Sequence, residues 1–288
     1  MQVMRTRVNV VLFCAIVYFI PQSFEFRESP RMRKARALAS SRKPAGKKSA
    51  GHIEDISAQV QVRRHPGARR LTLRVSRTSR AVIVTIPVQC DLDEAGIFLN
   101  RHIDWVRERL DSLPDPVPFR DGVAMPLRGE PHKVVFTGNK QSRIVTVVAV
   151  AGHRPEIRVP GCLDTAPRRL RDWLFEEARS DLAMRVGQHT RALQLKSKKI
   201  AVRDQTSRWG SCSSTGVLSF SWRLILAPPH ILDYVAAHEV AHLAEMNHGP
   251  RFWALVKKAY PEFQAAKTWL LVFGLDLHRY GAGEALAT

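Results

Sequence analysis

The chain has 288 residues and is 45% hydrophobic, which is enough to build a sizeable core in one large domain or two smaller ones. This composition excludes a wholly disordered chain. The formal net charge is +19, and residues 1–52 carry +9 of it, from 11 Lys and Arg residues against two Glu residues. The basic excess is therefore partly a property of the N-terminal tail.

Residues 8–20 form an apolar stretch that follows Arg5 and Arg7, which is the pattern of a secretion signal. The stretch is shorter than the roughly 20 residues that a comfortable membrane span needs, and no small-x-small cleavage site follows directly. A start of translation at Met32 is the alternative. We therefore expect a cytoplasmic protein without a stable membrane span, or an exported or membrane-anchored one if residues 8–20 act as a signal.

Residues 33–50 combine seven Lys and Arg residues with Ala, Ser, Pro and Gly, which is typical of a disordered basic tail. We assign residues 1–54 to this apolar segment and tail, outside the fold. Nucleic acid is a candidate partner of the tail, although a solvated tail explains the same composition.

Four cysteines are widely spaced and form no C-x-x-C pair: Cys14, Cys90, Cys162 and Cys212. This spacing indicates neither a disulfide framework nor a cysteine zinc site. It agrees with a reducing compartment.

Residues 55–160 show mixed α and β patterns, and we interpret them as an α+β accessory module rich in strands. Alternating apolar residues at 71–75 and 82–86, separated by a turn, predict a hairpin. Asp91 or Asp93 is the predicted cap of a helix that continues to about Leu113, before three prolines. Further short strands are expected around Val134–Phe136, Ile144–Val150 and Glu156–Val159.

Residues 161–280 form the predicted catalytic domain. A helix is expected from Asp164 or Thr165 to about Leu193, because apolar residues recur there at helical spacing. Two strands are expected on either side of the loop 208–213, at Lys199–Arg203 and Val217–Leu226. The second is a candidate sheet edge that could hold an extended peptide, although its alternating apolar side chains also fit a core face. Three helices are expected around residues 229–242, 250–258 and 263–273.

His238, Glu239 and His242 form the motif His-Glu-x-x-His. Histidines four positions apart lie on one helix face about 6 Å apart along the axis, so both imidazoles can reach one metal ion. Glu239 lies beside the pair and is the natural general base. The flanking apolar residues 231, 232, 235 and 236 indicate an amphipathic, half-buried helix, and Pro229 suits its first turn.

Two residues compete for the role of third ligand, His248 and Glu245. Glu245 shares the helical face of the histidine pair, but on a continuous helix its Cα would lie about 10 Å along the axis from that of His238. Ligand atoms on one zinc ion are at most ~4.2 Å apart. Since Asn247, Gly249 and Pro250 indicate a helix end, the chain can bring His248 back to the site from a second direction. We therefore predict His238, His242 and His248 as metal ligands.

Three neutral imidazoles leave a fourth position of a Zn²⁺ ion for water, which indicates a catalytic site. A structural zinc site is the competing interpretation, but such sites are usually closed by cysteines or a fourth protein ligand. Arg208 and Trp209, on a Gly-Ser loop, are candidate contacts for a substrate or an oxyanion. A packed loop whose tryptophan covers the core explains Trp209 equally well.

Four motifs resemble the YgjP-like metallopeptidase family, which is related to the SprT-like zinc proteases. They are the segments 208–213 (RWGSCS), 222–228 (WRLILAP), 238–242 (HEVAH) and 247–253 (NHGPRFW). The resemblance covers roughly residues 55–275 and implies a minimal gluzincin-like zinc hydrolase half. It also implies zinc ligands at His238, His242 and His248 and a catalytic Glu239.

The sequence therefore predicts a zinc-dependent metallopeptidase, with a metalloendopeptidase as the expected form and a protein or peptide as substrate. Two alternatives stay open at this point. One keeps the zinc chemistry but acts on a non-peptide substrate such as a nucleotide phosphate. The other is a nucleic-acid-binding protein with a structural metal site, which the pI of 10.6 favours, although no known nucleic-acid-binding motif accompanies it.

Overall fold

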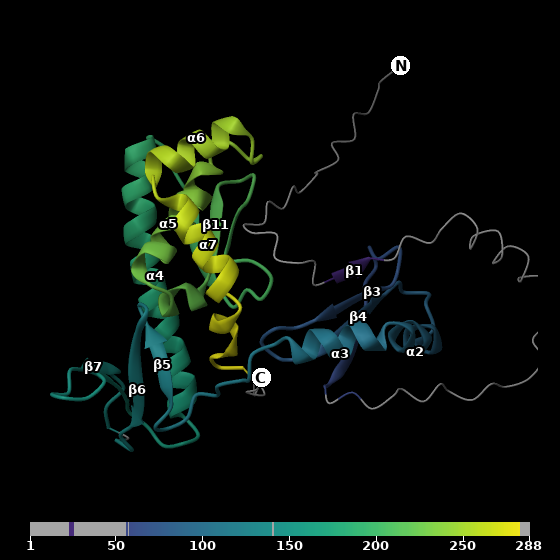
Figure 1. Cartoon of the computed structure of the whole chain (residues 1–288), viewed down its shortest axis with the longest axis horizontal. Helices are drawn as coiled ribbons and strands as arrows, with labels where there is room; N and C mark the ends of the chain where they lie inside the picture. Colours follow the sequence, from purple (N-terminus) through teal and green to yellow (C-terminus); the bar gives the residue numbers. More distant parts are fainter. Residues whose placement is uncertain (1–22, 26–55, 57, 140, 283–288) are drawn as a thin grey trace, which may run out of the picture. The chain divides into compact units, whose positions relative to one another are not determined.

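A computed structural model of the chain describes residues 23–25, 56, 58–139 and 141–282 (Figure 1). The apolar stretch 8–20, Met32 and the basic tail lie outside these residues. Within the described part no helix has both the length and the apolarity needed to cross a bilayer. The chain is mixed α+β, as the sequence predicts.

The chain divides into two compact units between Pro114 and Asp115. We call them the N-terminal unit and the C-terminal unit. The strands within residues 124–159, which the sequence analysis assigned to the accessory module, belong to the same compact unit as the histidine motif. A functional boundary near residue 160 stays a prediction.

The N-terminal unit is a four-stranded sheet with two helices, in the strand order β1-β3-β4-β2. Strands β3 and β4 form the predicted antiparallel hairpin, in which Leu73 lies opposite Val84, while β2 runs parallel to β4. Its elements are β1 (Ser23–Glu25), β2 (Val60–Arg64), β3 (Thr72–Val75), β4 (Val82–Ile86), α2 (Leu92–Arg101) and α3 (Ile103–Asp111).

The single helix predicted up to Leu113 is two helices, α2 and α3, with a break at His102. Asp91 caps α2, because its carboxylate accepts a hydrogen bond from the backbone N–H of Leu92. No Gly or Pro occurs at the break. The two helices pack against different strands, α2 on β4 and α3 on β3, so tertiary packing requires a change of direction that the sequence pattern does not reveal.

The C-terminal unit has two small sheets around a helical core. The first sheet has the order β5-β6-β8-β7 and the second the order β10-β11-β9. The strands are β5 (Ala124–Leu127), β6 (Glu130–Phe136), β7 (Thr146–Val148), β8 (Glu156–Val159), β9 (Lys199–Arg203), β10 (Gly210–Cys212) and β11 (Val217–Ser221). The helices are α4 (Ala166–Leu193), η1 (Trp222–Leu226), α5 (Pro229–Ala241), α6 (Pro250–Ala259), α7 (Phe263–Phe273) and η2 (Asp276–Arg279).

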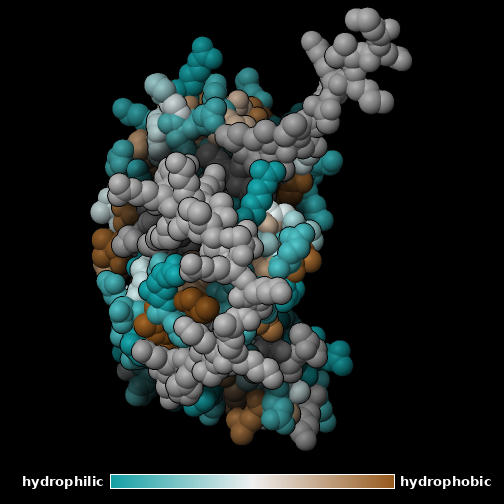
Figure 2. Space-filling model, turned by 90° about the vertical axis from the view of Figure 1, so that its right-hand side faces the viewer, coloured by the Kyte–Doolittle hydropathy of each residue, from teal (hydrophilic) through white to brown (hydrophobic). Residues whose placement is uncertain are grey.

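Helix α5 is the centre of this unit, and α4, α6, α7 and strand β10 all pack against it (Figure 1). The predicted apolar residues Ile231, Leu232, Val235 and Ala236 are at most 3% exposed. The prediction of an amphipathic, half-buried helix is wrong, however, because every residue of the helix from 231 to 241 except Asp233 is buried. Elements pack around the helix on several sides, which its local pattern does not reveal. On the face shown in Figure 2, the described hydrophobic residues lie in separate patches among hydrophilic ones. The continuous hydrophobic core of this unit is formed by the buried apolar residues around α5.

The predicted strand Val217–Leu226 is wrong in its second half. Strand β11 ends at Ser221, and Trp222–Leu226 form a 3-10 helix in which all five side chains are buried. The carbonyls of Ile225 and Leu226 accept hydrogen bonds from the backbone of the β5–β6 turn instead of from a neighbouring strand. This partner is distant in sequence, so the local alternation of apolar residues was misleading.

The prediction that this strand is a sheet edge is also wrong. Strand β11 lies between β9 and β10, because residues 210–212 of the predicted loop form a strand that pairs with it. Strand β10 is therefore an outer strand of this sheet.

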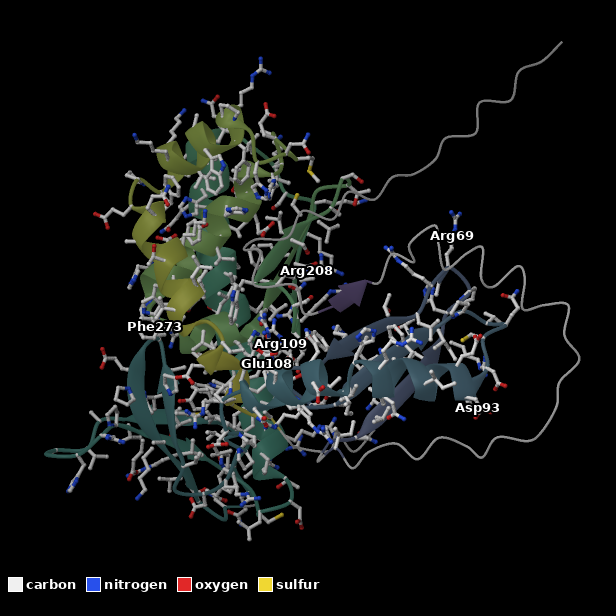
Figure 3. The ribbon with its side chains drawn as sticks, turned by 45° about the vertical axis from the view of Figure 1, so that its right-hand side comes forward. Arg69, Asp93, Glu108, Arg109, Arg208 and Phe273 are labelled. Atoms are coloured by element: carbon white, nitrogen blue, oxygen red, sulfur yellow. The ribbon has the colours of Figure 1, made fainter. Side chains whose placement is uncertain are left out.

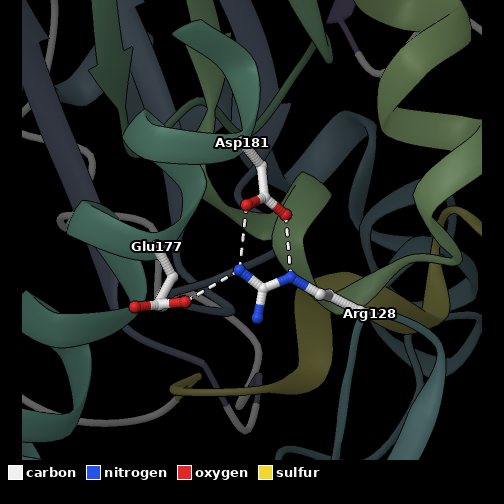
Figure 4. A network of polar contacts seen from close by, with 3 residues as sticks. All are labelled: Arg128, Glu177 and Asp181. Atoms are coloured by element: carbon white, nitrogen blue, oxygen red, sulfur yellow. Dashed lines mark hydrogen bonds and ion pairs between the residues drawn. The ribbon is translucent and has the colours of Figure 1, made fainter. Parts of the chain in front are cut away.

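The β5–β6 turn connects three parts of the C-terminal unit. Arg128 donates hydrogen bonds to the carboxylates of Glu177 and Asp181 on α4, at 2.7 to 2.9 Å (Figure 4). The backbone N–H groups of Arg128 and Gly129 bond to η1. Because η1 leads directly into α5, the turn holds the start of the histidine helix against α4.

Gly129→Ala is expected to destabilise the C-terminal unit more than Gly138→Ala. Both glycines have positive φ, so each Ala carries a backbone strain of about 1 kcal/mol. Only at Gly129 would the new Cβ approach a neighbour, Pro228, whose Cα lies at 3.0 Å. Because Pro228 must move to make room, Gly129→Ala should lose about 1–3 kcal/mol more unfolding free energy than Gly138→Ala, measured by urea denaturation. Equal losses would show that the contact with Pro228 does not limit the turn.

Candidate metal centre

His238 and Glu239 lie in the last turn of α5, and His242 is the residue that ends the helix. Pro229 occupies the first turn, as predicted, where its missing N–H leaves no hydrogen bond unmade. All three side chains are buried, with at most 2% of their surface exposed. The helix therefore presents its motif to the interior of the unit.

His248 lies after the helix, in the segment between α5 and α6. Its Nε2 is 3.0 Å from Nε2 of His238, and the three histidines offer ligand nitrogens that all lie within 4.8 Å of one another. Nitrogens bound to one metal ion at ~2.1 Å are at most ~4.2 Å apart, so a shift of under ~1 Å suffices for a shared ion. The structure thus brings the three predicted ligands together.

Glu245 follows the end of α5 and does not extend its helical face. The hydrogen bond from Nδ1 of His242 goes to the main-chain carbonyl of Glu245, at 2.9 Å. Because a carbonyl oxygen only accepts, the proton of the neutral ring is on Nδ1, and Nε2 carries a lone pair instead of a proton. Nε2 of His242 is buried and has no hydrogen-bond partner among the described residues. Such a nitrogen is well suited to bind a metal ion.

Aromatic rings fix the planes of the histidines. Phe252 stacks on His242 with ring centroids 4.4 Å apart, and Trp253 stacks on His248 at 5.7 Å. Phe252 and Trp253 belong to α6, so this helix supports both the ring at the end of α5 and the ring that follows it. These two contacts fix the orientation of the His242 and His248 rings.

Burial lowers the pKa of all three imidazoles. The pKa of His238 is well below its ordinary value, that of His242 is lowered to about 4, and that of His248 is lowered as well. Desolvation is the largest cause for each ring, because burial disfavours the charged imidazolium. At neutral pH the three rings are neutral, which is the form that binds a metal.

The Glu239 side chain is fully buried, and neither carboxylate oxygen has a hydrogen-bond partner among the described residues. Burial raises its pKa well above the ordinary value, while the positive charge of Arg208 acts in the opposite direction. Gly210 on β10 provides the space for this carboxylate, since a Cβ at Gly210 would lie 2.5 Å from Oε1 of Glu239. The absence of a side chain at Gly210 is therefore a requirement of the site.

Arg208 and Trp209 have different environments. Arg208, labelled in Figure 3, is half-buried in the segment before β10, and its charge reaches Glu239. Trp209 is 3% exposed, and its ring packs against that of His278 with centroids 4.9 Å apart. This environment favours the packed-loop alternative for Trp209, and a substrate contact of its side chain stays a prediction.

Four supporting residues were not predicted from the sequence: Gly210, Phe252, Trp253 and Lys267. The first three lie inside the motifs that resemble the family, but those motifs do not indicate a role for each residue. Lys267 on α7 lies in none of these motifs. Its charge contributes to lowering the pKa of His238 and His248. Only the packing of α7 reveals its place.

A cluster of three neutral histidines, two of them buried and one half-buried, with a buried carboxylate on the helix of the first, is the arrangement of a metal-dependent hydrolase. A family model described as YgjP-like, metallopeptidase domain, matches residues 69–272. The chain therefore belongs to the YgjP-like metallopeptidase family. No curated protein and no solved structure matches the chain. Membership of this family implies a metal ion, and the three-histidine cluster could bind one.

Gly210→Ala is expected to destabilise the unit by about 1–3 kcal/mol, because the new methyl group collides with the buried carboxylate. In a Glu239→Ala background the colliding atoms are absent, so the same change should cost at least about 1 kcal/mol less. Urea denaturation of the four proteins of this cycle measures the coupling. Gly187→Ala in α4 is the control and should be neutral or stabilising. Additive losses would contradict the assigned contact.

His248→Ala is expected to weaken zinc binding more than about a hundredfold, since it removes a ligand rather than a supporting group. Glu245→Ala should bind zinc almost normally, because His242 contacts only the main-chain carbonyl of Glu245. Zinc titration against a competing chelator measures both affinities. A large loss for Glu245→Ala with near-native binding by His248→Ala would reverse the assignment.

Proposed function

We propose that the protein is a zinc-dependent metallopeptidase, with His238, His242 and His248 as zinc ligands and Glu239 as general base. The observation that carries this proposal is the buried Glu239 carboxylate, which has no hydrogen-bond partner among the described residues and lies beside the three-nitrogen cluster. A purely structural metal site has no need of such a carboxylate. The general-base role rests on this placement.

The ligand set supports zinc in particular. Three imidazole nitrogens are a common set in catalytic zinc sites, which keep one position for water or substrate. None of the three described cysteines is in a disulfide, and none belongs to the cluster. The site therefore differs from the cysteine-closed arrangement of structural zinc. Reduced cysteines also support the proposed cytoplasmic compartment.

The proposed reaction assigns the proton transfers to Glu239. When bound, zinc polarises a carbonyl group and makes water more acidic. Glu239 accepts the proton of the attacking water and passes it to the leaving nitrogen. The burial of the carboxylate strengthens its interactions with the attacking water and with the leaving nitrogen, because bulk water does not screen them. The positive charge of Arg208 favours the anionic form of Glu239, because it lowers the pKa of this carboxyl.

Strand β10 supports a peptide as the substrate. It is an outer strand of its sheet, and its first residue, Gly210, adjoins Glu239. An extended peptide that adds to this edge by main-chain hydrogen bonds would pass beside the general base. Because the edge can receive the middle of a chain as well as an end, we propose an endopeptidase. The proposed binding strand is therefore β10 and not β11, which the sequence predicted as the edge.

A phosphate-containing substrate such as a nucleotide is the second candidate. The cationic side chains Arg208 and Lys267, whose charges act on Glu239 and on the histidines respectively, are the observation that favours it. A screen that contains both peptides and nucleoside triphosphates decides between the two substrate classes. Binding of nucleic acid by the basic tail stays a prediction about residues outside the described part.

Glu239→Gln is expected to retain about one zinc ion per chain while its peptide hydrolysis falls by roughly 10²–10⁴-fold, the usual contribution of a general base. Glutamine keeps the size of the side chain but accepts no proton. Zinc content by atomic absorption and hydrolysis of a peptide library measure the two properties, with Glu245→Gln as the control. A folded Glu239→Gln protein that loses its zinc, or one that keeps full activity, would refute the role.

A further inference from the structure

Lys267 is a cation held close to the histidine cluster by an aromatic ring. It lies on α7, and its Nζ is 5.2 Å from the ring centroid of Trp253. The same ring stacks on His248 at 5.7 Å and contacts the ring of His238 edge-on at 5.8 Å. The ammonium group and two of the three proposed ligands thus contact the same indole ring.

This ammonium group forms no ion pair with any carboxylate among the described residues, although it is half-buried. Two half-buried arginines of the same unit are paired, Arg128 with Asp181 and Arg185 with Asp233. The contact with Trp253 contributes attraction to the ring face but uses none of the three N–H donors as a hydrogen bond to a charged partner. Lys267 thus keeps donors for a group that the described part of the chain does not supply.

We infer that Lys267 binds a carboxylate of the substrate, so that the enzyme prefers peptides with an acidic side chain close to the bond that it cleaves. This inference rests on the proposed peptidase function and adds a substrate class to it. A lysine ammonium is a compact charge that can approach a carboxylate from several directions. The Trp253 ring limits its movement, which positions the charge without neutralising it.

The test uses the zinc-loaded full chain and pairs of acetylated, amidated peptides that differ only by Glu against Gln, or Asp against Asn. Wild-type protein should hydrolyse the acidic member with a kcat/KM at least about tenfold higher, as expected for a hydrogen bond to a charged group. Lys267→Met should reduce this ratio to about one and act mainly through KM. Lys267→Arg should retain most of the preference.

Controls separate the charge of Lys267 from its packing. Lys258→Met removes an exposed lysine from the last turn of α6 and should leave the ratio unchanged. Zinc content and melting temperature of Lys267→Met should match those of wild type, and Lys267→Glu should invert the preference if the protein folds. Peptides with a free or an amidated C-terminus distinguish an acidic side chain from a terminal carboxylate.

Binding by the Glu239→Gln protein gives a second readout that does not depend on turnover. Isothermal titration should show tighter binding of the acidic peptide, and this difference should vanish when Lys267→Met is added. Equal hydrolysis and binding of the two peptides, or a preference that survives Lys267→Met, would overturn the inference alone. If wild type hydrolyses no peptide and the Glu239→Gln protein binds none, the proposed function fails together with it.

Discussion

The burial of one carboxylate is the constraint on which the rest of the C-terminal unit depends. Glu239 is fully buried and has no hydrogen-bond partner among the described residues, an arrangement that costs several kcal/mol unless a positive charge compensates it. The three-histidine cluster beside it supplies the place for such a charge as a metal ion. Gly210 supplies the space, and Arg208 supplies a further positive charge.

The scaffold around α5 holds this arrangement in place at both ends of the helix. At its start, the β5–β6 turn bonds to η1 through two backbone N–H groups, while Arg128 binds the two acidic residues of α4. At its end, Phe252 and Trp253 of α6 stack on the rings of His242 and His248. Contacts at both ends of α5 thus orient the histidine rings and Glu239, which would otherwise have to be ordered when the metal and the substrate bind.

The errors of the sequence-based predictions share one physical cause. Residues 222–226 alternate like a strand, but their backbone bonds to a turn almost a hundred residues earlier. Residues 210–212 resemble a loop because they are small and polar, yet they pair with β11. The helix predicted up to Leu113 breaks at His102 because its two halves pack on different strands. In each case a partner distant in sequence overrides the local pattern.

The sequence by itself determined the family, the α+β class, and the grouping of His238, Glu239 and His242, because helical spacing alone places these side chains together. It also indicated His248 through the helix-ending residues that precede and follow it. Only the tertiary structure decided that Gly210 faces Glu239, that Trp209 packs inside, and that Lys267 lies over Trp253 beside the cluster. These contacts join α5, α6, α7 and β10, whose relative positions result from the packing of one shared core and not from any local pattern.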